Sequence, residues 1–195
     1  RLALSERVIS HDYLAEFNAP ALAVPEEERG WTILQPALPV LEDTRLDVDG
    51  VGRNEKFRDL LESLPGESDW GNAVAFLDEH QEALDTIRRA AAAPRLAFVG
   101  ELAPTDSDGA LSKSLINVLL PHLGTLRRAS KLLAMDWRRA AIDGDGDRIV
   151  LDARALSGLA RGAAEYPSLI GGLVGVAINA LLCDLVGQSL RDSPE

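Results

Sequence analysis

The chain of 195 residues contains a single cysteine, Cys183. One cysteine excludes an internal disulfide and a metal centre built on several thiolates. A lone cysteine among apolar neighbours is most often a small core residue, so we expect Cys183 to be buried. With 46 % hydrophobic residues at this length, the chain has enough apolar side chains to bury a core without disulfides or metal ions.

Positive charge is also scarce. The 20 Lys and Arg residues stand against 31 Asp and Glu, which gives a formal net charge of −11. No cluster of basic residues with interleaved aromatics offsets this charge, and an acidic chain repels phosphate backbones, so nucleic acid is not an expected partner. An acidic surface is typical of a well-solvated protein, and recognition of a basic partner is the alternative.

Complete catalytic and nucleotide-binding motifs are absent from the sequence. It has no HExxH, no GxSxG, no P-loop and no Cys/His pair, and the glycines of GVG at 50–52 do not join a strand to a helix. His11, His80 and His122 are far apart along the chain, each on an expected helix, where a single histidine is typical of a surface or an interface. We expect no cofactor and no catalytic residue among these motifs. A site assembled from carboxylates distant in sequence stays open.

Runs of alternating β-branched residues are missing as well, and helical periodicity dominates, which predicts an all-α fold. Residues 40–53 read as a loop, and the stretch after Pro94 reads as irregular, with a brief extended piece at Leu96 to Val99. Trp31, Trp70 and Trp137 fall on apolar stripes and predict core packing, with ligand stacking as the alternative. The expected helices cover Ser5 to Phe17, a short segment from Pro25, Asn54 to Leu64, Asp69 to about Ala93, Leu111 to Ala140 with Pro121 as a kink or boundary, a helix after the turn at 143–147, and a last helix from Pro167.

The last of these helices is the most apolar part of the chain. Leu169 to Val186 runs for 18 residues, with Gly171 and Gly175 in a GxxxG pattern. The length is at the lower limit for a membrane span, and Asn179 and Asp184 argue against one. A helix that is apolar on all sides is what the centre of a helical domain requires. We therefore expect this helix in the buried core, with a dimer interface as the alternative.

The stretch DGDGD at 143–147 is the most suggestive of chemistry. Asp143, Asp145 and Asp147 match positions one, three and five of a calcium-binding loop. Arg148 stands at position six, where the loop needs glycine, and Arg154 at position twelve, where it needs a chelating glutamate. The sequence therefore argues against a calcium site, and we expect no metal there.

The same stretch is well suited to a corner between two antiparallel helices. Gly144 and Gly146 allow the chain to reverse, and Asp145 or Asp147 can cap the following helix by accepting hydrogen bonds from its free amides. We expect the two helices and this corner to belong to the best-defined part of the fold, residues 111–190.

The run LLAMDWRRAAIDGDGDRIVLDARALSGLARGAAEYPSLIGGLVGVAINALL, from Leu132, resembles a family of uncharacterised bacterial helical proteins that often carry an N-terminal membrane segment. The resemblance rests on the Gly144–Asp145 corner, the helix from Asp147 to Leu156, Pro167, Leu169 and Ile170, and the segment Leu173 to Ile178; NAPALAVPEEERGW and AAAAPRLAF add to it. The corner is also similar to that of a tetratricopeptide (TPR) repeat, but three copies at a period near 34 residues are not found. The family implies a helical fold and a place at the cell envelope or in the periplasm, and it supplies no activity. Without an upstream signal or anchor, the expected place is the cytoplasm.

Together these features predict a single all-α domain over residues 1–195, built from stacked antiparallel helical hairpins that are TPR-like or form an irregular bundle. Residues 1–110 are expected to be looser, with long loops. The leading hypothesis for function is a non-enzymatic interaction or scaffold protein, with a protein partner or self-association through the last helix. The alternative is a small-ligand-binding or hydrolase-like helical protein whose site is assembled from distant residues.

Overall fold

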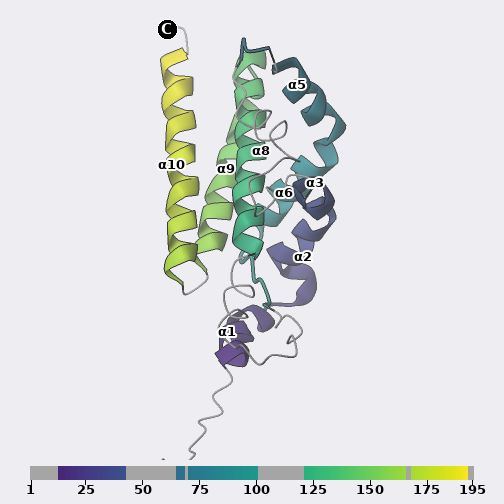
Figure 1. Cartoon of the computed structure of the whole chain (residues 1–195), viewed down its shortest axis with the longest axis vertical. Coiled ribbons are helices and arrows are strands. Elements are labelled where there is room, and N and C mark those ends of the chain that lie inside the picture. The colour runs from purple at the N-terminus through teal and green to yellow at the C-terminus, as the bar shows by residue number, and fades with distance from the viewer. Residues whose placement is uncertain (1–12, 43–64, 69, 101–120, 166–167, 193–195) are drawn as a thin grey trace, which may run out of the picture.

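A computed structural model describes residues 13–42, 65–68, 70–100, 121–165 and 168–192 (Figure 1). Every regular element within these ranges is a helix and none is a strand, which confirms the predicted all-α class. The elements are α1 (Tyr13–Leu22), η1 (Glu26–Glu28), α2 (Gly30–Leu34), η2 (Gln35–Ala37), α3 (Leu38–Glu42), α5 (Trp70–Glu79), α6 (Gln81–Ala92), α8 (Pro121–Asp143), α9 (Gly146–Ala164) and α10 (Leu169–Asp192).

Three long helices, α8, α9 and α10, lie side by side and form the main body of the molecule (Figure 1). α8 is the central one, because it packs against α9 and α10 on one side and against α3, α5 and α6 on the other. α8 and α9 form one antiparallel hairpin, as predicted, and α10 returns along α9. Of the two expected arrangements, TPR-like or irregular bundle, the TPR-like one stays a prediction.

The corner between α8 and α9 forms as the sequence predicted. Gly144 has a φ of +71°, a backbone conformation that a side chain disfavours. Asp145 is the N-cap of α9, and its side chain accepts a hydrogen bond from the Arg148 amide at 3.0 Å. The Asp145 amide in turn donates to the Ala140 carbonyl at 2.8 Å, so one residue terminates α8 and begins α9.

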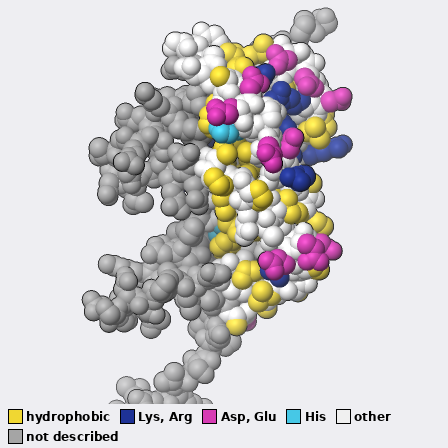
Figure 2. Space-filling model, turned by 90° about the vertical axis from the view of Figure 1, so that its right-hand side faces the viewer, with side chains coloured by type: hydrophobic (Ala, Val, Ile, Leu, Met, Phe, Trp, Pro, Cys, Tyr) yellow, Lys and Arg dark blue, Asp and Glu magenta, His cyan; other side chains and the backbone are white. Residues whose placement is uncertain are grey.

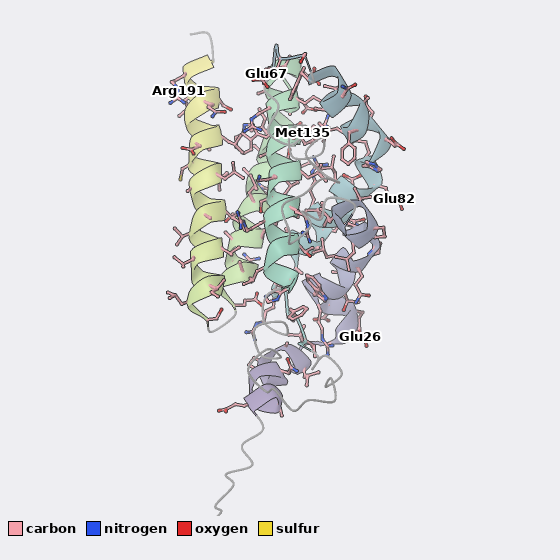
Figure 3. All side chains as sticks on the ribbon, in the orientation of Figure 1. Glu26, Glu67, Glu82, Met135 and Arg191 are labelled. Atoms are coloured by element: carbon pink, nitrogen blue, oxygen red, sulfur yellow. The ribbon has the colours of Figure 1, made fainter. Side chains whose placement is uncertain are left out.

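The hydrophobic core lies around α8. Met135, labelled beside α8 in Figure 3, is fully buried like Leu126 and Leu133 on the same helix. α6 and α9 contribute most of the remaining core side chains, among them Leu84, Ile87, Leu156 and Leu159. Trp137 is also buried, as its apolar stripe predicted, whereas Trp31 and Trp70 are partly buried against the core.

Two glycines let helices approach each other closely. A Cβ atom at Gly158 of α9 would lie 2.1 Å from the Ala91 carbonyl oxygen of α6, and one at Gly175 of α10 would lie 2.9 Å from the Ala160 carbonyl oxygen of α9. Both contacts are with backbone atoms, which cannot swing aside as the end of a side chain does. Gly175, the second glycine of the GxxxG pattern, thus lies where α10 and α9 are in close contact.

The N-terminal elements are more broken than the periodicity predicted. The helix expected from Pro25 is interrupted at Arg29, because the Gly30 and Trp31 amides donate to the Arg95 and Leu96 carbonyls at 3.0 and 2.8 Å. The segment after Pro94 therefore supplies backbone acceptors to the start of α2. It forms no strand, although sequence suggested an extended piece there.

Three further boundaries differ from those predicted. α1 continues past Asn18 and Pro20 to Leu22, and the Asn18 carboxamide exchanges two hydrogen bonds with the Gly100 backbone instead of ending the helix. The long helix expected from Asp69 is divided into α5 and α6 at His80, whose ring contacts Phe76 edge-on at a centroid distance of 4.3 Å. The loop expected at 40–53 begins later than predicted, because α3 continues to Glu42. The rest of that loop, the helix expected at 54–64, and the starts of the helices expected from Ser5 and Leu111 lie outside the described residues.

Candidate functional site

α10 presents a face for which the fold gives no covering partner among the described residues. It forms the outer edge of the three-helix layer (Figure 1), and the side chains on its outer side project away from α8 and α9 (Figure 3). Six large hydrophobic side chains on it are exposed: Leu169, Ile170, Leu173, Val176, Val186 and Leu190. The most exposed are Leu169 at 81 %, Leu190 at 73 % and Val176 at 66 %.

The opposite side of α10 packs well, so the helix is firmly placed. Gly171, Gly175, Ile178 and Leu185 are buried at intervals of three, four and seven residues, the spacing of one helix face. Near the end of the helix, the Trp137 indole nitrogen on α8 donates to the Ser189 hydroxyl at 2.9 Å. The inner face of α10 is therefore held by both neighbouring helices, and the exposed face is the one left over.

This arrangement corrects two predictions. α10 was expected in the buried core, but only 22 % of its most apolar 18-residue stretch is buried. Cys183 was expected to be a core residue, and it is exposed on the outer side of α10. An apolar composition on all sides does not state how many neighbours a helix has, and here the neighbours cover one side only.

α10 is long and apolar enough to cross a membrane by length and composition, over Leu169–Arg191. The packing of α10 against α8 and α9, however, argues against insertion into a bilayer in this arrangement. α8 and α9 lie along α10, and they carry charged side chains such as Arg139, Asp147 and Arg154. A bilayer that received α10 in this arrangement would have to accept those charges as well, at a cost of several kcal/mol (about 2.5–3.5 for each one at the bilayer centre).

A second feature, missed by sequence reasoning, is a cluster of buried charges between α6, α8 and α9. Asp136 on α8 and Asp152 on α9 are both fully buried. Arg88 on α6 joins them: its Nη2 atom lies 2.5 Å from Asp136 Oδ2, and its Nε atom lies 2.9 Å from Asp152 Oδ1. Arg148 also binds Asp136, with Nε at 2.6 Å from Oδ2 and Nη2 in contact with Oδ1.

The two carboxylates differ in their surroundings. Asp136 accepts hydrogen bonds from two guanidinium groups through both oxygens. Asp152 receives Arg88 at Oδ1 only, and Oδ2 is buried without a hydrogen-bond partner. Burial raises the pKa of Asp152 from 3.8 to about 7, and the nearby Asp136 carboxylate adds to the shift, while Arg88 opposes it.

A catalytic role for this cluster would require that a substrate can reach one of its carboxylates. Both aspartate side chains have no exposed surface, and the side chains of Arg88 and Arg148 that bind them are only 13 % and 19 % exposed. The cluster does assemble residues that are 48 and 64 positions apart, as the enzyme alternative requires. We interpret it as a structural tie that joins three helices.

The raised pKa of Asp152 makes stability depend on pH in a defined direction. The folded protein holds a proton on Asp152 between about pH 4 and 7, where the unfolded chain has lost it. Relative to Asp152→Asn, which is neutral at every pH, we expect the free energy of unfolding of the wild type to fall as pH rises through this window, by on the order of 1 kcal/mol per pH unit. Urea denaturation at pH 5.5 and 8 measures the difference. A wild type that gains stability toward pH 8 relative to the variant would contradict it.

Two polar side chains near the end of α9 hold the segment that follows α6. The Glu165 carboxylate accepts hydrogen bonds from the Leu96 and Ala97 amides at 2.9 and 3.1 Å. Arg161 Nη2 donates to the Ala93 carbonyl at 3.1 Å. These contacts satisfy backbone groups where α6 ends, so they are structural as well.

The two histidines in the described ranges lie on different elements. His122 on α8 is fully buried and stacks on Phe98 at a ring-centroid distance of 4.1 Å, which corrects the expected surface position. Burial lowers its pKa to about 4, so the ring is neutral near pH 7. His80 is half-buried at the α5–α6 break, and His11 lies outside the described residues.

The three aspartates of the corner are used separately. Asp145 caps α9, Asp143 lies 3.5 Å from Arg139 on the preceding turn, and Asp147 is exposed in the first turn of α9. Across the described ranges, no group of three or more His, Cys, Asp or Glu side chains has a metal-binding arrangement.

The buried cluster did leave a signal in the sequence. Asp136 stands between Leu133 and Trp137 on one apolar stripe, and Asp152 stands beside Ile149 and Leu156 on another. A charge on a core stripe needs a buried partner, so the pattern could have predicted ion pairs without saying which residues form them.

Comparisons with known proteins give no further indication of function, since no family model, no curated protein and no solved structure matches this chain.

Proposed function

We propose that this protein is a non-enzymatic interaction protein and that its binding surface is the outer face of α10. The observation that carries the proposal is the exposure of six large hydrophobic side chains along one 24-residue helix whose other face is firmly packed. A contiguous apolar face of this kind on a protein surface marks an interaction site more often than a chance feature.

The free energy gained by burying apolar side chains favours a partner that covers this face. Complete burial of one Leu, Ile or Val side chain contributes about 1.5–3 kcal/mol relative to full exposure. Leu169, Leu173, Val176 and Leu190 each expose more than half of their surface. A partner that covers them gains several kcal/mol from these contacts alone, before the costs of association.

The face shown in Figure 2 differs in character. It looks onto the side of the molecule where α2, α3, α5 and α6 lie, and Asp, Glu, Lys and Arg side chains are spread among the hydrophobic ones. Such a mixture is typical of a solvated surface. The apolar face of α10 is the stronger candidate for a binding surface.

The alternative function, a small-ligand-binding or hydrolase-like protein, would use the Asp136–Asp152 cluster. Asp152 has the raised pKa that a general acid or base often has. We favour the interaction function because both carboxylates are fully buried and bound by arginine side chains, whereas the apolar face of α10 is exposed.

The double substitution Leu173→Glu with Val176→Glu tests the proposal. We expect the wild type either to associate, as seen by sedimentation velocity, or to bind the apolar dye bis-ANS, because its α10 face is uncovered. Two carboxylates on that face should abolish association and dye binding, while far-UV circular dichroism stays unchanged.

A matched control places the same two charges elsewhere. Val150 and Leu151 on α9 are exposed to a similar degree, 47 % and 48 %, and Val150→Glu with Leu151→Glu should leave both readouts as in the wild type. A wild type that stays monomeric and binds no more dye than the α10 variant would contradict the proposal.

A further inference from the structure

We infer that the occupant of the α10 face is a second copy of this chain, whose α10 packs in parallel against the first. The inference rests on the proposed function and names its partner. It is carried by the order of the exposed residues, by the position of two polar side chains among them, and by the helices that flank α10.

The exposed face of α10 follows a heptad repeat. Leu169, Val176, Cys183 and Leu190 recur every seven residues, and so do Leu173, Ala180 and Gly187 between them. The intervals alternate four and three, which is the spacing of the two core positions of a coiled coil. All of these residues except the half-buried Gly187 are exposed, and the buried residues Gly171, Ile178 and Leu185 lie on the opposite side of the helix. α10 thus carries one apolar seam for its own fold and a second seam that faces outward.

The polar residues beside the outer seam favour a parallel partner. Residues that flank a parallel coiled coil meet five positions apart, and this spacing brings Asn179 of one copy beside Asp184 of the other. An amide can donate to a carboxylate there, and symmetry makes the contact twice. An antiparallel pair with full overlap would instead set Asp184 beside Ala177 and Asn179 beside Val186, where neither finds a polar partner.

The C-terminal half of the seam is built from small residues. Ala180, Cys183 and Gly187 occupy three successive layers. Small side chains at a helix crossing let the two backbones come close, as Gly175 already does against α9 within one chain. Leu169, Leu173 and Val176 fill the wider first half, and α10 offers a contact about 36 Å long from its 24 residues.

A second copy fits this surface better than a bilayer does. Asp184 is exposed on the flank of the seam, and an ionised carboxylate in lipid is costly. In a dimer the same carboxylate lies at the rim beside Asn179 and water. The seam is also complementary to itself. A twofold interface requires this, because the same surface patch of each copy contacts the other.

Cys183 reports the pairing directly, since residues on the seam of a parallel pair face their own copies. Under mild copper–phenanthroline oxidation of the full chain we expect Cys183 to form a disulfide-linked dimer, and Cys183→Ser to form none. The variant Cys183→Ser with Ala180→Cys, one layer away, should cross-link as well. Cys183→Ser with Gln188→Cys, which moves the thiol off the seam, should not. Sedimentation equilibrium should show an unoxidised species of twice the 21.0 kDa chain mass, lost in Leu173→Glu with Val176→Glu.

Other outcomes overturn the inference in distinct ways. Cross-linking only when Cys183 and Ala180→Cys are present together would show an antiparallel pair. A monomer that binds bis-ANS through α10 would refute the dimer and keep the proposed function. A monomer that co-sediments with phosphatidylglycerol vesicles would assign the face to lipid. A monomer that does neither would refute both proposals.

Discussion

Replacing Asp136 by alanine is expected to lower the free energy of unfolding by about 3–5 kcal/mol. Asp136 is fully buried and accepts hydrogen bonds from both Arg88 and Arg148. Its removal leaves two largely buried guanidinium groups. Arg88 still pairs with Asp152, but Arg148 loses the carboxylate that binds it. An unpaired charge in this position costs more than the lost ion pair contributed. Urea denaturation followed by circular dichroism measures the loss.

The matched control for this prediction is Asp85→Ala. Asp85 also pairs with Arg88, at 2.9 Å, but its side chain is 67 % exposed. Solvent screens an exposed ion pair, so we expect a loss of less than about 1 kcal/mol. If Asp136→Ala proves too unstable to purify, Asp136→Asn retains the shape without the charge and should still lose more than the control. Equal losses at Asp136 and Asp85 would show that the cluster does not hold the three helices together.

The contrast between the α8–α9 corner and α10 explains what sequence could predict. The corner depends on residues within eight positions of each other, from Ala140 to Arg148, and its glycine and its cap were foreseen because local chemistry decides them. The place of α10 depends on which helices cover it. α8, which carries the buried polar residues Thr125, Ser130 and Asp136, became the central helix, while the more apolar α10 lies at the edge.

The reason is that tertiary contacts compensate the polar residues of α8. The Ser130 hydroxyl donates to the Leu126 carbonyl one turn earlier, and Asp136 is neutralised by arginines from α6 and α9. Arg88 was not identifiable as a partner, since it lies 48 residues from Asp136. Helix type was therefore predictable from periodicity, but the order of helices in the core and the buried ion cluster were not.

The second large effect concerns the contact of α6 with α9. Gly158→Ala is expected to destabilise the protein by about 3 kcal/mol, at the upper end of overpacking effects. The new Cβ would lie 2.1 Å from the Ala91 carbonyl oxygen and 2.9 Å from its carbon. α6 cannot shift freely, because Arg161 holds the Ala93 carbonyl and Glu165 holds the Leu96 amide just beyond it.

A graded series of glycine variants separates this clash from the ordinary effect of alanine in a helix. Gly124→Ala on α8 meets only the end of the Arg128 side chain at 3.8 Å, and alanine there should add up to about 1 kcal/mol of stability through helix propensity. Gly162→Ala would approach the Leu96 Cβ atom at 3.0 Å, so we expect an intermediate loss as that side chain gives way. Urea midpoints should therefore fall in the order Gly124→Ala, Gly162→Ala, Gly158→Ala. If Gly158→Ala is as stable as Gly124→Ala, then α6 and α9 are not in the close contact described. In that case Arg88 on α6 and Asp152 on α9 would also not lie at hydrogen-bonding distance.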